Sequence, residues 1–418
     1  MILELKMKNV YSYKNEVTYS MLAPSNKVKF RYQDNYNTLN GFDILKTAVI
    51  VGENAGGKSN FIKGLQYFKD LFKETSEQTK ISLDTIYNED LLVDTKSIDE
   101  RVSKDQITQE FSIILTSNNS LVYKYELIIS WLGIERESLS YTDDKSHVFK
   151  KVFECITSYD ELKTNNIRKT YLDIPTNKKI QDLVINNLNS GMTKGLIINS
   201  LSLLGIPNTS EFINEINSIK IQKNPFDMPV GLQYQIKPDE LKPYLPIMKK
   251  EEFLDIFKMV DSSIIGIEID DDQTLSQSLI KRRHPDGSIS KRLIGLDSTG
   301  VKNFLVMSIL IYKVVYENAI VFNDEMDSTF NPILTSKVIS YIHSFETKGQ
   351  FIFTTHNIFN LTFQTFMKEQ MFIVEKNKET LESKLYSLGG FDDLRYDSNE
   401  KIYEYYMKGV LGGVDSGN

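Results

Sequence analysis

GENAGGKS, residues 52–59, follows the short apolar run AVIV (48–51) and precedes NFIKGL (60–65), which is typical of the start of a helix. The spacing of Gly52, Gly57, Lys58 and Ser59 fits the pattern G-x-x-x-x-G-K-S. A buried strand before this motif and a helix after it form the context that the motif requires. The stretch therefore predicts a phosphate-binding loop in an α/β fold, and residues 52–59 are called the phosphate loop below.

The chemistry of such a loop follows from its residue types. Glycines let the backbone curl tightly, so that successive N–H groups and the positive end of the next helix point at one anion. Lys58 is expected to reach the β- and γ-phosphates of ATP, and the Ser59 hydroxyl to hold Mg²⁺. The predicted nucleotide-binding residues are Gly52, Glu53, Asn54, Ala55, Gly56, Gly57, Lys58, Ser59 and Asn60.

Composition sets limits on the class of protein. With 418 residues, the chain is long enough for two or three lobes. Its formal charge of −7 gives no overall footprint for nucleic acid and leaves a local basic patch open. The single cysteine, Cys155, excludes an internal disulfide framework, and the four scattered histidines have no metal-ligand spacing.

Apolar segments give no signal for a membrane protein. The longest apolar run, 304–316, is interrupted by Ser308 and Lys313 and falls short of the roughly 18 residues that span a bilayer. The opening MILELKMKNVYSYK alternates with period two and lacks a cleavage site, so it predicts a strand rather than a signal peptide. We expect a cytoplasmic protein that does not bind membranes.

Two sets of strands and a helical segment divide the chain. Strands are predicted at 110–115 and 121–130 as a hairpin, and NKKIQDLVINNLNSG (177–191) and SEFINEINSI (210–219) have helical spacing between proline breakers. We therefore expect residues 1–156 to form the first half of the main domain, 157–262 a mostly helical insertion, and 263–418 the second half. The insertion could serve packing alone, or it could form an arm with a dimer or partner surface.

A second hairpin is predicted around HPDG (284–287), between strands at 275–283 and 288–294, and a strand at 264–269 precedes it. The hairpin carries a basic cluster. Its side chains could contact the phosphates of a nucleic acid, although such a cluster is more often a solvated face, which we favour. The cluster consists of Lys281, Arg282, Arg283, Lys291 and Arg292.

Catalytic carboxylates are predicted at the end of AIVFNDE (319–325), because α/β sheets present their ligands at the C-terminal ends of strands. Asp324 can coordinate Mg²⁺ through water, and Glu325 can orient and deprotonate the attacking water. After the next apolar strand, FIFTTHN (351–357), His356 can donate a hydrogen bond to the γ-phosphate and so distinguish ATP from ADP. The sequence thus predicts Glu325 and His356 as catalytic residues, and Ser59 and Asp324 as the magnesium site.

The turn DSTGVK, residues 297–302, precedes an apolar helix expected from Asn303 and offers a second anion-binding helix start. We call these residues the signature turn. Phosphate loop, long insertion, signature turn, carboxylate strand and strand with histidine follow one another in the order of an ABC-type ATPase head. The chain resembles that family, and its long insertion resembles the SMC and RecF class.

Within this class the chain most resembles the OLD-like ATPases (overcoming lysogenization defect), which include ATPase subunits of PARIS, Septu and abortive-infection systems in phage defence. The resemblance implies an ABC-type P-loop NTPase head with mixed β-sheets and a homodimer or higher homo-oligomer formed through the heads. It implies that Ser298, Gly300 and Lys302 serve the ATP held by the other protomer, that Asp327 lies in the D-loop, and that His356 is the switch histidine. The matching segments are KNVYSY (8–13), GENAGGKSN (52–60), the Asp-Gly hairpin, DSTGVKN (297–303), NDEMDSTFNP (323–332), FTTHN (353–357), EQMFIVEKN (369–377) and SKLYSLGGFDDLR (383–395).

The sequence departs from the family pattern in three places. Asn323 replaces an apolar residue before the acidic pair, Asn331 stands where a histidine is frequent, and DSTGV is a loose version of the signature. These departures bear on the rate of hydrolysis and the tightness of dimerisation. The magnesium-sensing glutamine has no clear position, and Gln106 and Gln109 are candidates only by their location.

Some OLD-like proteins carry a C-terminal Toprim nuclease, and too few residues follow Arg395 for such a domain. We therefore expect a separately encoded effector, either a Toprim or HNH nuclease or a toxin. The leading hypothesis is an ATP-dependent sensor and regulator in anti-phage defence. The alternative is a RecF- or SMC-like clamp for DNA repair or recombination, and neighbouring genes would distinguish the two. A transporter ATPase is disfavoured by the length of the insertion.

Overall fold

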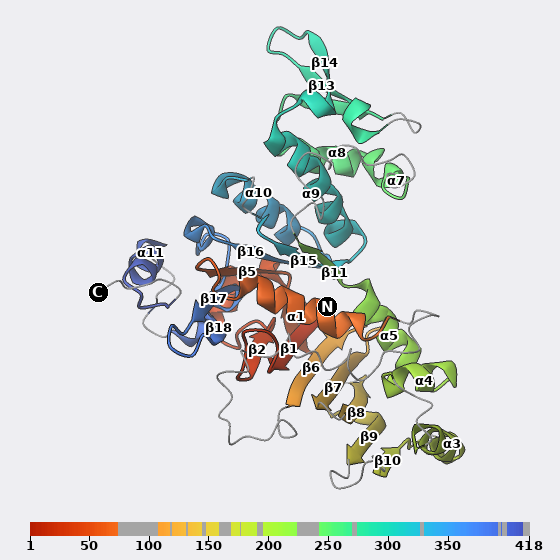
Figure 1. Cartoon of the computed structure of the whole chain (residues 1–418). Helices are drawn as coiled ribbons and strands as arrows, with labels where there is room; N and C mark the ends of the chain where they lie inside the picture. Colours follow the sequence, from red (N-terminus) through yellow and green to blue (C-terminus); the bar gives the residue numbers. More distant parts are fainter. Residues whose placement is uncertain are drawn as a thin grey trace.

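The computed structural model of the chain describes residues 1–73, 108–117, 119–130, 133–143, 148–158, 169–175, 177–189, 195–223, 242–269, 274–326, 330–391, 394 and 399–412. Two large sheets form its centre, with helices between them and on the outer face of one sheet (Figure 1). The predicted α/β class with mixed β-sheets is confirmed.

The sheet that carries the phosphate loop has six strands in the order β11-β15-β16-β5-β17-β18. The first five are parallel, and β18 is antiparallel to β17. Its central strands are buried along their whole length, as their apolar and β-branched residues predict for a parallel sheet covered on both faces. The bounds are β11 Lys220–Lys223, β15 Ile320–Asp324, β16 Gln350–Thr355, β5 Thr47–Gly52, β17 Met371–Lys376 and β18 Ser383–Ser387.

The second sheet is antiparallel, with seven strands in the order β10-β9-β8-β7-β6-β1-β2. The predicted hairpin of 110–115 with 121–130 is confirmed as β6 and β7, whose register runs from Thr108 opposite Ser130 to Thr116 opposite Val122. Alternating buried positions along these strands give the sheet one apolar face. The bounds are β1 Ile2–Lys8, β2 Val17–Ser20, β6 Thr108–Thr116, β7 Val122–Ser130, β8 Gly133–Thr142, β9 Lys150–Ser158 and β10 Lys169–Asp173.

Helix α1 (Lys58–Asp70) lies between the two sheets. Alternate residues of β5 divide between two cores: Ala48 and Ile50 pack in the core that contains α1, and Val49 and Val51 in the core on the other face. That second core is covered by α9 (Thr299–Tyr316) and α10 (Pro332–His343). Because α1 begins at Lys58 rather than at the predicted Asn60, the lysine and serine of the phosphate loop form its first turn.

The apolar helix α9 is long and apolar enough, by length and composition, to cross a membrane. It is the one such helix in the parts of the chain that the structure describes. Most of it is buried within the protein, where it packs on β15, β16 and α10 as a core helix. Packing therefore accounts for its apolar composition, and the cytoplasmic location stays a prediction.

A smaller three-stranded antiparallel sheet consists of β12 (Ile264–Glu268), β13 (Leu279–Arg283) and β14 (Ile289–Leu293). The predicted hairpin around residues 284–287 is confirmed, with shorter strands because 275–277 form a 3₁₀ turn. This small sheet lies next to the N-terminal end of α9 and away from the parallel sheet (Figure 1). Helices α7 (Leu245–Met248) and α8 (Glu251–Phe257) pack beside it.

The segment 157–262 supplies helices and also an edge strand to each large sheet. Strand β10 pairs with β9, and β11 pairs in parallel with β15. The described helices of this segment are α3 (Lys178–Asn189), α4 (Ile197–Leu203), α5 (Thr209–Ser218), α7 and α8. The division at 156 and 262 stays a prediction. Outside this segment, β3 (Tyr36–Leu39) pairs with β4 (Phe42–Leu45), and α11 (Asn399–Met407) is the last described helix.

Candidate nucleotide-binding and catalytic site

The phosphate loop connects β5 to α1 at the C-terminal edge of the parallel sheet. Gly52 ends β5, and Gly57 caps α1 with a φ of 119°, a left-handed conformation that glycine adopts without strain. The tip of the loop, residues 53–55, is exposed, whereas Gly56 and Gly57 are buried. The loop thus presents a helix N-terminus and an exposed backbone tip to solvent, as phosphate binding requires.

The side chain of Lys58 folds back into the loop. Its Nζ donates to the carbonyl oxygens of Gly52, at 2.7 Å, and of Glu53, at 2.9 Å. The same Nζ lies 3.1 Å from Nδ1 of His356. The structure therefore brings together two predicted site residues that lie 298 positions apart in the chain.

The acidic pair lies at the end of β15. Asp324 is the buried last residue of the strand, and Glu325 is exposed, with a φ of 55°. The hydroxyl of Thr354, on the neighbouring β16, hydrogen-bonds to Asp324 Oδ1 and accepts the backbone N–H of Glu325 at 2.8 Å. This one threonine therefore fixes both the carboxylate of Asp324 and the backbone direction of Glu325.

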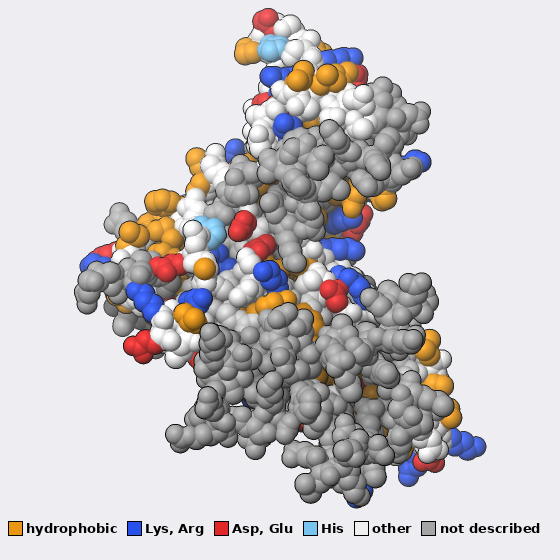
Figure 2. Space-filling model, viewed as in Figure 1, with side chains coloured by type: hydrophobic (Ala, Val, Ile, Leu, Met, Phe, Trp, Pro, Cys, Tyr) orange, Lys and Arg blue, Asp and Glu red, His pale blue; other side chains and the backbone are white. Residues whose placement is uncertain are grey.

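Strand order explains why these residues share one edge. Strands β15, β16 and β5 are parallel neighbours, so the acidic pair, His356 and the phosphate loop all follow the C-terminal ends of adjacent strands. Figure 2 shows acidic, basic and histidine side chains gathered on the face over this part of the molecule.

The residues predicted to hold magnesium fit that ion chemically. Ser59 offers a hydroxyl in the first turn of α1, and Asp324 offers a carboxylate oxygen, both hard oxygen donors. Among the described residues, no group of three histidine, cysteine or acidic side chains could hold a metal. A site with few protein ligands, completed by phosphate oxygens and water, is the usual environment of Mg²⁺.

The phosphate loop is supported by residues that the sequence did not single out individually. Ser383, the first residue of β18, has its Oγ 2.7 Å from the carbonyl oxygen of Gly56 and 2.7 Å from Oγ of Ser12. Asn60 Nδ2 donates to Ser12 Oγ at 3.0 Å. Because each hydroxyl has one proton, the chain of hydrogen bonds runs from Asn60 through Ser12 and Ser383 to the Gly56 carbonyl.

Tyr13 adds a further support, since its buried hydroxyl donates to the carbonyl oxygen of Gly57 at 3.0 Å. Ser12 and Tyr13 belong to the KNVYSY segment, which the sequence analysis linked to the site only through a family resemblance. Ser383 opens the segment SKLYSLGGFDDLR, which was linked in the same way, and its contact with Ser12 had no signal of its own because it spans 371 positions.

The signature turn occupies the start of α9, which begins at Thr299 rather than at Asn303 as expected. Ser298 is its exposed N-cap, and its Oγ accepts the N–H of Val301 at 3.3 Å. Lys302 Nζ lies 3.5 Å from the carbonyl oxygen of Gly295, and Gly300 lies in the first turn of the helix. This end of α9 lies beside the β12–β14 sheet, apart from β5 and the start of α1 (Figure 1).

Four further positions were named in the sequence analysis, and the structure describes two of them. Asp327 and Gln106 lie outside the described residues. Gln109 is buried in β6, where its Nε2 donates to the carbonyl oxygen of Asn9 at 3.1 Å. Asn331 caps α10, since its Oδ1 accepts the N–H of Leu334 at 2.9 Å.

Asn323 is fully buried, and neither of its side-chain polar atoms has a hydrogen-bond partner within the described part of the chain. An unsatisfied buried amide is destabilising by about 1–3 kcal/mol. This departure from the family pattern thus lowers the stability of the fold at the residue directly before Asp324.

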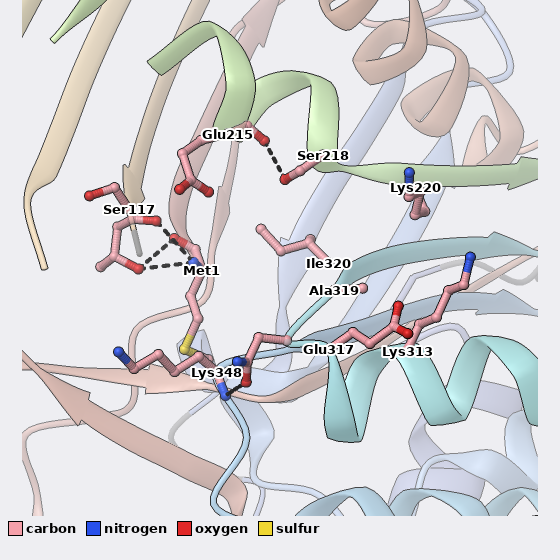
Figure 3. Close-up of a pocket in the computed structure, with 12 residues that line it drawn as sticks. Met1, Ser117, Glu215, Ser218, Lys220, Lys313, Glu317, Ala319, Ile320 and Lys348 are labelled. Atoms are coloured by element: carbon pink, nitrogen blue, oxygen red, sulfur yellow. Dashed lines mark hydrogen bonds between the residues drawn. The ribbon is translucent and has the colours of Figure 1, made fainter. Parts of the chain in front are cut away.

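A separate cavity of about 270 Å³ lies at the opposite edge of the parallel sheet, near the start of β15 and β11 (Figure 3). The amino group of Met1 lines it and donates to the carbonyl oxygen of Thr116 at 3.2 Å and to its Oγ1 at 2.9 Å. Burial lowers the pKa of this amino group to about 5. None of the predicted site residues lines this cavity.

The topology and the geometry of the loop and the acidic pair define a P-loop ATPase. The chain matches, over residues 48–361, the family described as "AAA domain, putative AbiEii toxin, Type IV TA system", and it belongs to that family. A search of curated proteins gave no match.

Solved structures with a similar chain trace include SMC heads. One is the SMC head domain from Thermotoga maritima, with 12% identity and a TM-score of 0.45 over 92% of this chain and 98% of that one. Another is the Smc head domain with an extended coiled coil bound to the C-terminal domain of ScpA, derived from Pyrococcus furiosus. It has 15% identity and a TM-score of 0.42 over 98% of this chain and 100% of that one.

Proposed function

We propose that this chain is an OLD-like ABC-type ATPase that hydrolyses ATP at sites shared between two protomers and controls a separate effector in anti-phage defence. The observation that carries the ATPase part is the convergence of Lys58, His356 and the acidic pair on one edge of the parallel sheet. The family description, which names a putative AbiEii toxin and a type IV TA system, supports the defence role.

Each residue at this edge has a part in hydrolysis. Lys58 exchanges its carbonyl partners for phosphate oxygens and neutralises charge that develops on the β- and γ-phosphates. Glu325 orients and deprotonates the attacking water, while Thr354 keeps its backbone in place. His356, already beside Lys58, hydrogen-bonds to the γ-phosphate. Ser59 and Asp324 would hold Mg²⁺, which would supply charge neutralisation at the phosphates.

A second protomer supplies the signature turn. The start of α9 lies apart from the phosphate loop of its own chain (Figure 1), its N-cap Ser298 is exposed, and the positive end of the helix dipole there favours an anion. In a head-to-head dimer with two-fold symmetry, Ser298, Gly300 and Lys302 of one protomer contact the γ-phosphate bound at Lys58 of the other. Because ATP then contacts both protomers only in the closed dimer, ATP favours closure and hydrolysis weakens it.

Mixing two variants tests the shared site. Ser298→Arg blocks the contact in trans and leaves the phosphate loop intact, whereas Lys58→Ala removes ATP binding. Neither variant alone should hydrolyse ATP, and a mixture should restore at most one working site in each mixed dimer. Wild-type hydrolysis by a strictly monomeric Ser298→Arg protein would show that the site is complete within one chain.

The regulatory role is tested in cells. The chain and its neighbouring genes are expressed together and challenged with phage, and the same genes are tested with Glu325→Gln. We expect protection by the wild type only, together with toxicity or nuclease activity that depends on the neighbouring effector gene. ATPase activity stimulated by DNA, without any effect on phage growth, would instead support a repair or recombination clamp.

A further inference from the structure

Arg282 links the small sheet to the signature turn by an ion pair. Its Nη1 lies 2.7 Å from Oδ2 of Asp297, and its Nε donates to Oδ2 of Asp261 at 2.8 Å. The side chains of Arg282 and Asp297 are only 16% and 6% exposed, so the pair is shielded from water. Shielded pairs of this kind are sensitive to the loss of either partner.

Asp297 is the residue immediately before the N-cap of α9. Its Oδ1 accepts the backbone N–H of Ser298 at 2.8 Å, so its carboxylate determines the direction in which the signature turn leaves the small sheet. The same carboxylate is a negative charge next to the place where we expect a γ-phosphate. Without neutralisation it would repel that phosphate, because two negative charges at short range interact strongly where water is excluded.

Three of the four other cations in the basic cluster lie on the opposite face of the small sheet from Arg282. Side chains alternate between the faces of a strand, and Arg282 shares its face with the buried Ile280, whereas Lys281 and Arg283 lie on the other face. Lys281 and Lys291 both pair with Glu268, at 2.5 and 3.0 Å. Arg292 lies opposite Ile280 and so shares the face of Arg282, but among the described residues it is Arg282 that forms an ion pair with the signature turn.

We propose that Arg282 is a positioning residue that neutralises and fixes Asp297, so that the signature turn can accept the γ-phosphate of a partner protomer. This assigns one residue of the hairpin's basic cluster to the ATPase site instead of to nucleic acid. The inference rests on the proposed shared site.

The test compares Arg282→Gln with Arg283→Gln, a matched control on the exposed face of the same strand. ATP affinity at the phosphate loop, measured by calorimetry, should be unchanged in both. ATP-driven dimerisation, measured by light scattering in a Glu325→Gln background, should weaken about tenfold or more for Arg282→Gln and stay at the wild-type level for Arg283→Gln.

Two further variants separate charge from shape. Arg282→Gln combined with Asp297→Asn removes both charges and should recover dimerisation to within about threefold of the wild type. Arg282→Lys keeps the positive charge but replaces the planar guanidinium, which contacts two carboxylates, by a single ammonium group. Its ATP-driven dimerisation should be weaker than that of the wild type and stronger than that of Arg282→Gln. A double variant as weak as the single one, or a lysine variant no better than glutamine, would overturn the proposal, and melting temperatures show whether each variant is folded.

The Ser298→Arg variant distinguishes a failure of the proposed shared site from a failure of the role given to Arg282. If Ser298→Arg leaves hydrolysis and dimerisation intact, the shared site itself is wrong. If Ser298→Arg blocks both and Arg282→Gln behaves as the wild type, the shared site stands and only the role of Arg282 is wrong.

Discussion

The phosphate loop and the signature turn are both helix N-termini, but the protein supports them differently. The loop lies at the C-terminal edge of the parallel sheet and is held by Ser383, Tyr13 and its own Lys58 through hydrogen bonds to loop carbonyls. The signature turn is exposed at Ser298 and is tied to the small sheet by the pair of Arg282 with Asp297.

This difference matches two different tasks. A preorganised loop can bind nucleotide within one chain, because the N-terminus of α1 is already in place and hydrogen bonds fix the loop carbonyls. The turn at the start of α9 lies apart from that loop (Figure 1), so in the proposed dimer its anion is the nucleotide held by the partner protomer. We therefore expect damage to the loop to affect binding, and damage to the turn to affect dimerisation and hydrolysis.

The largest expected effect comes from Lys58→Ala. The lysine is the cation that the loop places beside the phosphates, so we expect ATP affinity to fall at least about 100-fold. Calorimetry with ATP measures it, and Lys63→Ala, one turn further along α1, is the control. Unchanged ATP affinity in Lys58→Ala would mean that the phosphate loop does not bind the nucleotide, and the contrast between the loop and the signature turn would fail.

Glu325→Gln should separate catalysis from binding. The amide keeps the shape of the side chain but cannot accept the proton of the attacking water, so we expect hydrolysis to slow about 100-fold while ATP affinity is retained. Steady-state phosphate release measures the rate, and size-exclusion chromatography should show ATP-bound dimers accumulating. Glu317→Gln, at the C-cap of α9 before β15 begins, is the control, and wild-type turnover in Glu325→Gln would move the catalytic role to another residue.

Local spacing explains which parts of this site could be predicted from the sequence. The phosphate loop, the acidic pair and the hairpins are encoded within a few consecutive residues, because each depends on a strand, a turn and the residue types at fixed offsets. The pairing of β6 with β7 as a hairpin followed from such a pattern.

The remaining features depend on contacts between distant segments. Strand β11, with the sequence KIQK, is too short and polar to be recognised as a strand, and it exists because it pairs with β15. The contact of Ser383 with Ser12 and the ion pair of Arg282 with Asp297 likewise arise only once the sheets have assembled. Helix boundaries also shifted, since α9 begins at Thr299, directly after its cap residue Ser298, and not at the expected Asn303.

Gly57→Ala tests how closely the loop is held. A Cβ at this position would lie 2.3 Å from Ser383 Oγ, and the φ of 119° is unfavourable for any other residue. The strain of about 1–3 kcal/mol should displace the loop and lower ATP affinity about tenfold. Adding Ser383→Gly should relieve the contact but not the backbone strain, so affinity should recover only in part. Full affinity in Gly57→Ala alone would mean that the loop is looser than the structure indicates.

The N-terminus of α4 differs from both the phosphate loop and the signature turn, because a carboxylate of the protein itself occupies it. The buried carboxylate of Glu137 accepts the N–H groups of Ile197 and Ile198 at the start of α4, at 2.7 and 2.9 Å, and the hydroxyl of Tyr125 at 3.0 Å. Burial raises the pKa of Glu137 to about 7, against the opposing effect of these hydrogen bonds. This end of a helix is thus already occupied, and we expect it to contribute to stability without any role in ATP binding.

The smallest expected effect is therefore that of Glu137→Gln, which should leave ATP affinity unchanged and alter the pH dependence of stability. The folded protein holds the proton of Glu137 more tightly than the unfolded chain, in which the ordinary pKa is 4.5. The stability linked to this proton is fully present below about pH 4.5 and is lost as the pH rises through about 7, amounting to at most about 3 kcal/mol. Glutamine resembles the protonated acid, so the melting temperature of the wild type should fall relative to that of Glu137→Gln between pH 5 and pH 8. Glu135→Gln, on the same strand and partly exposed, is the control and should show no such trend. A difference in melting temperature between the wild type and Glu137→Gln that stays constant from pH 5 to pH 8 would contradict the prediction. It would mean that the carboxylate stays charged at the start of α4.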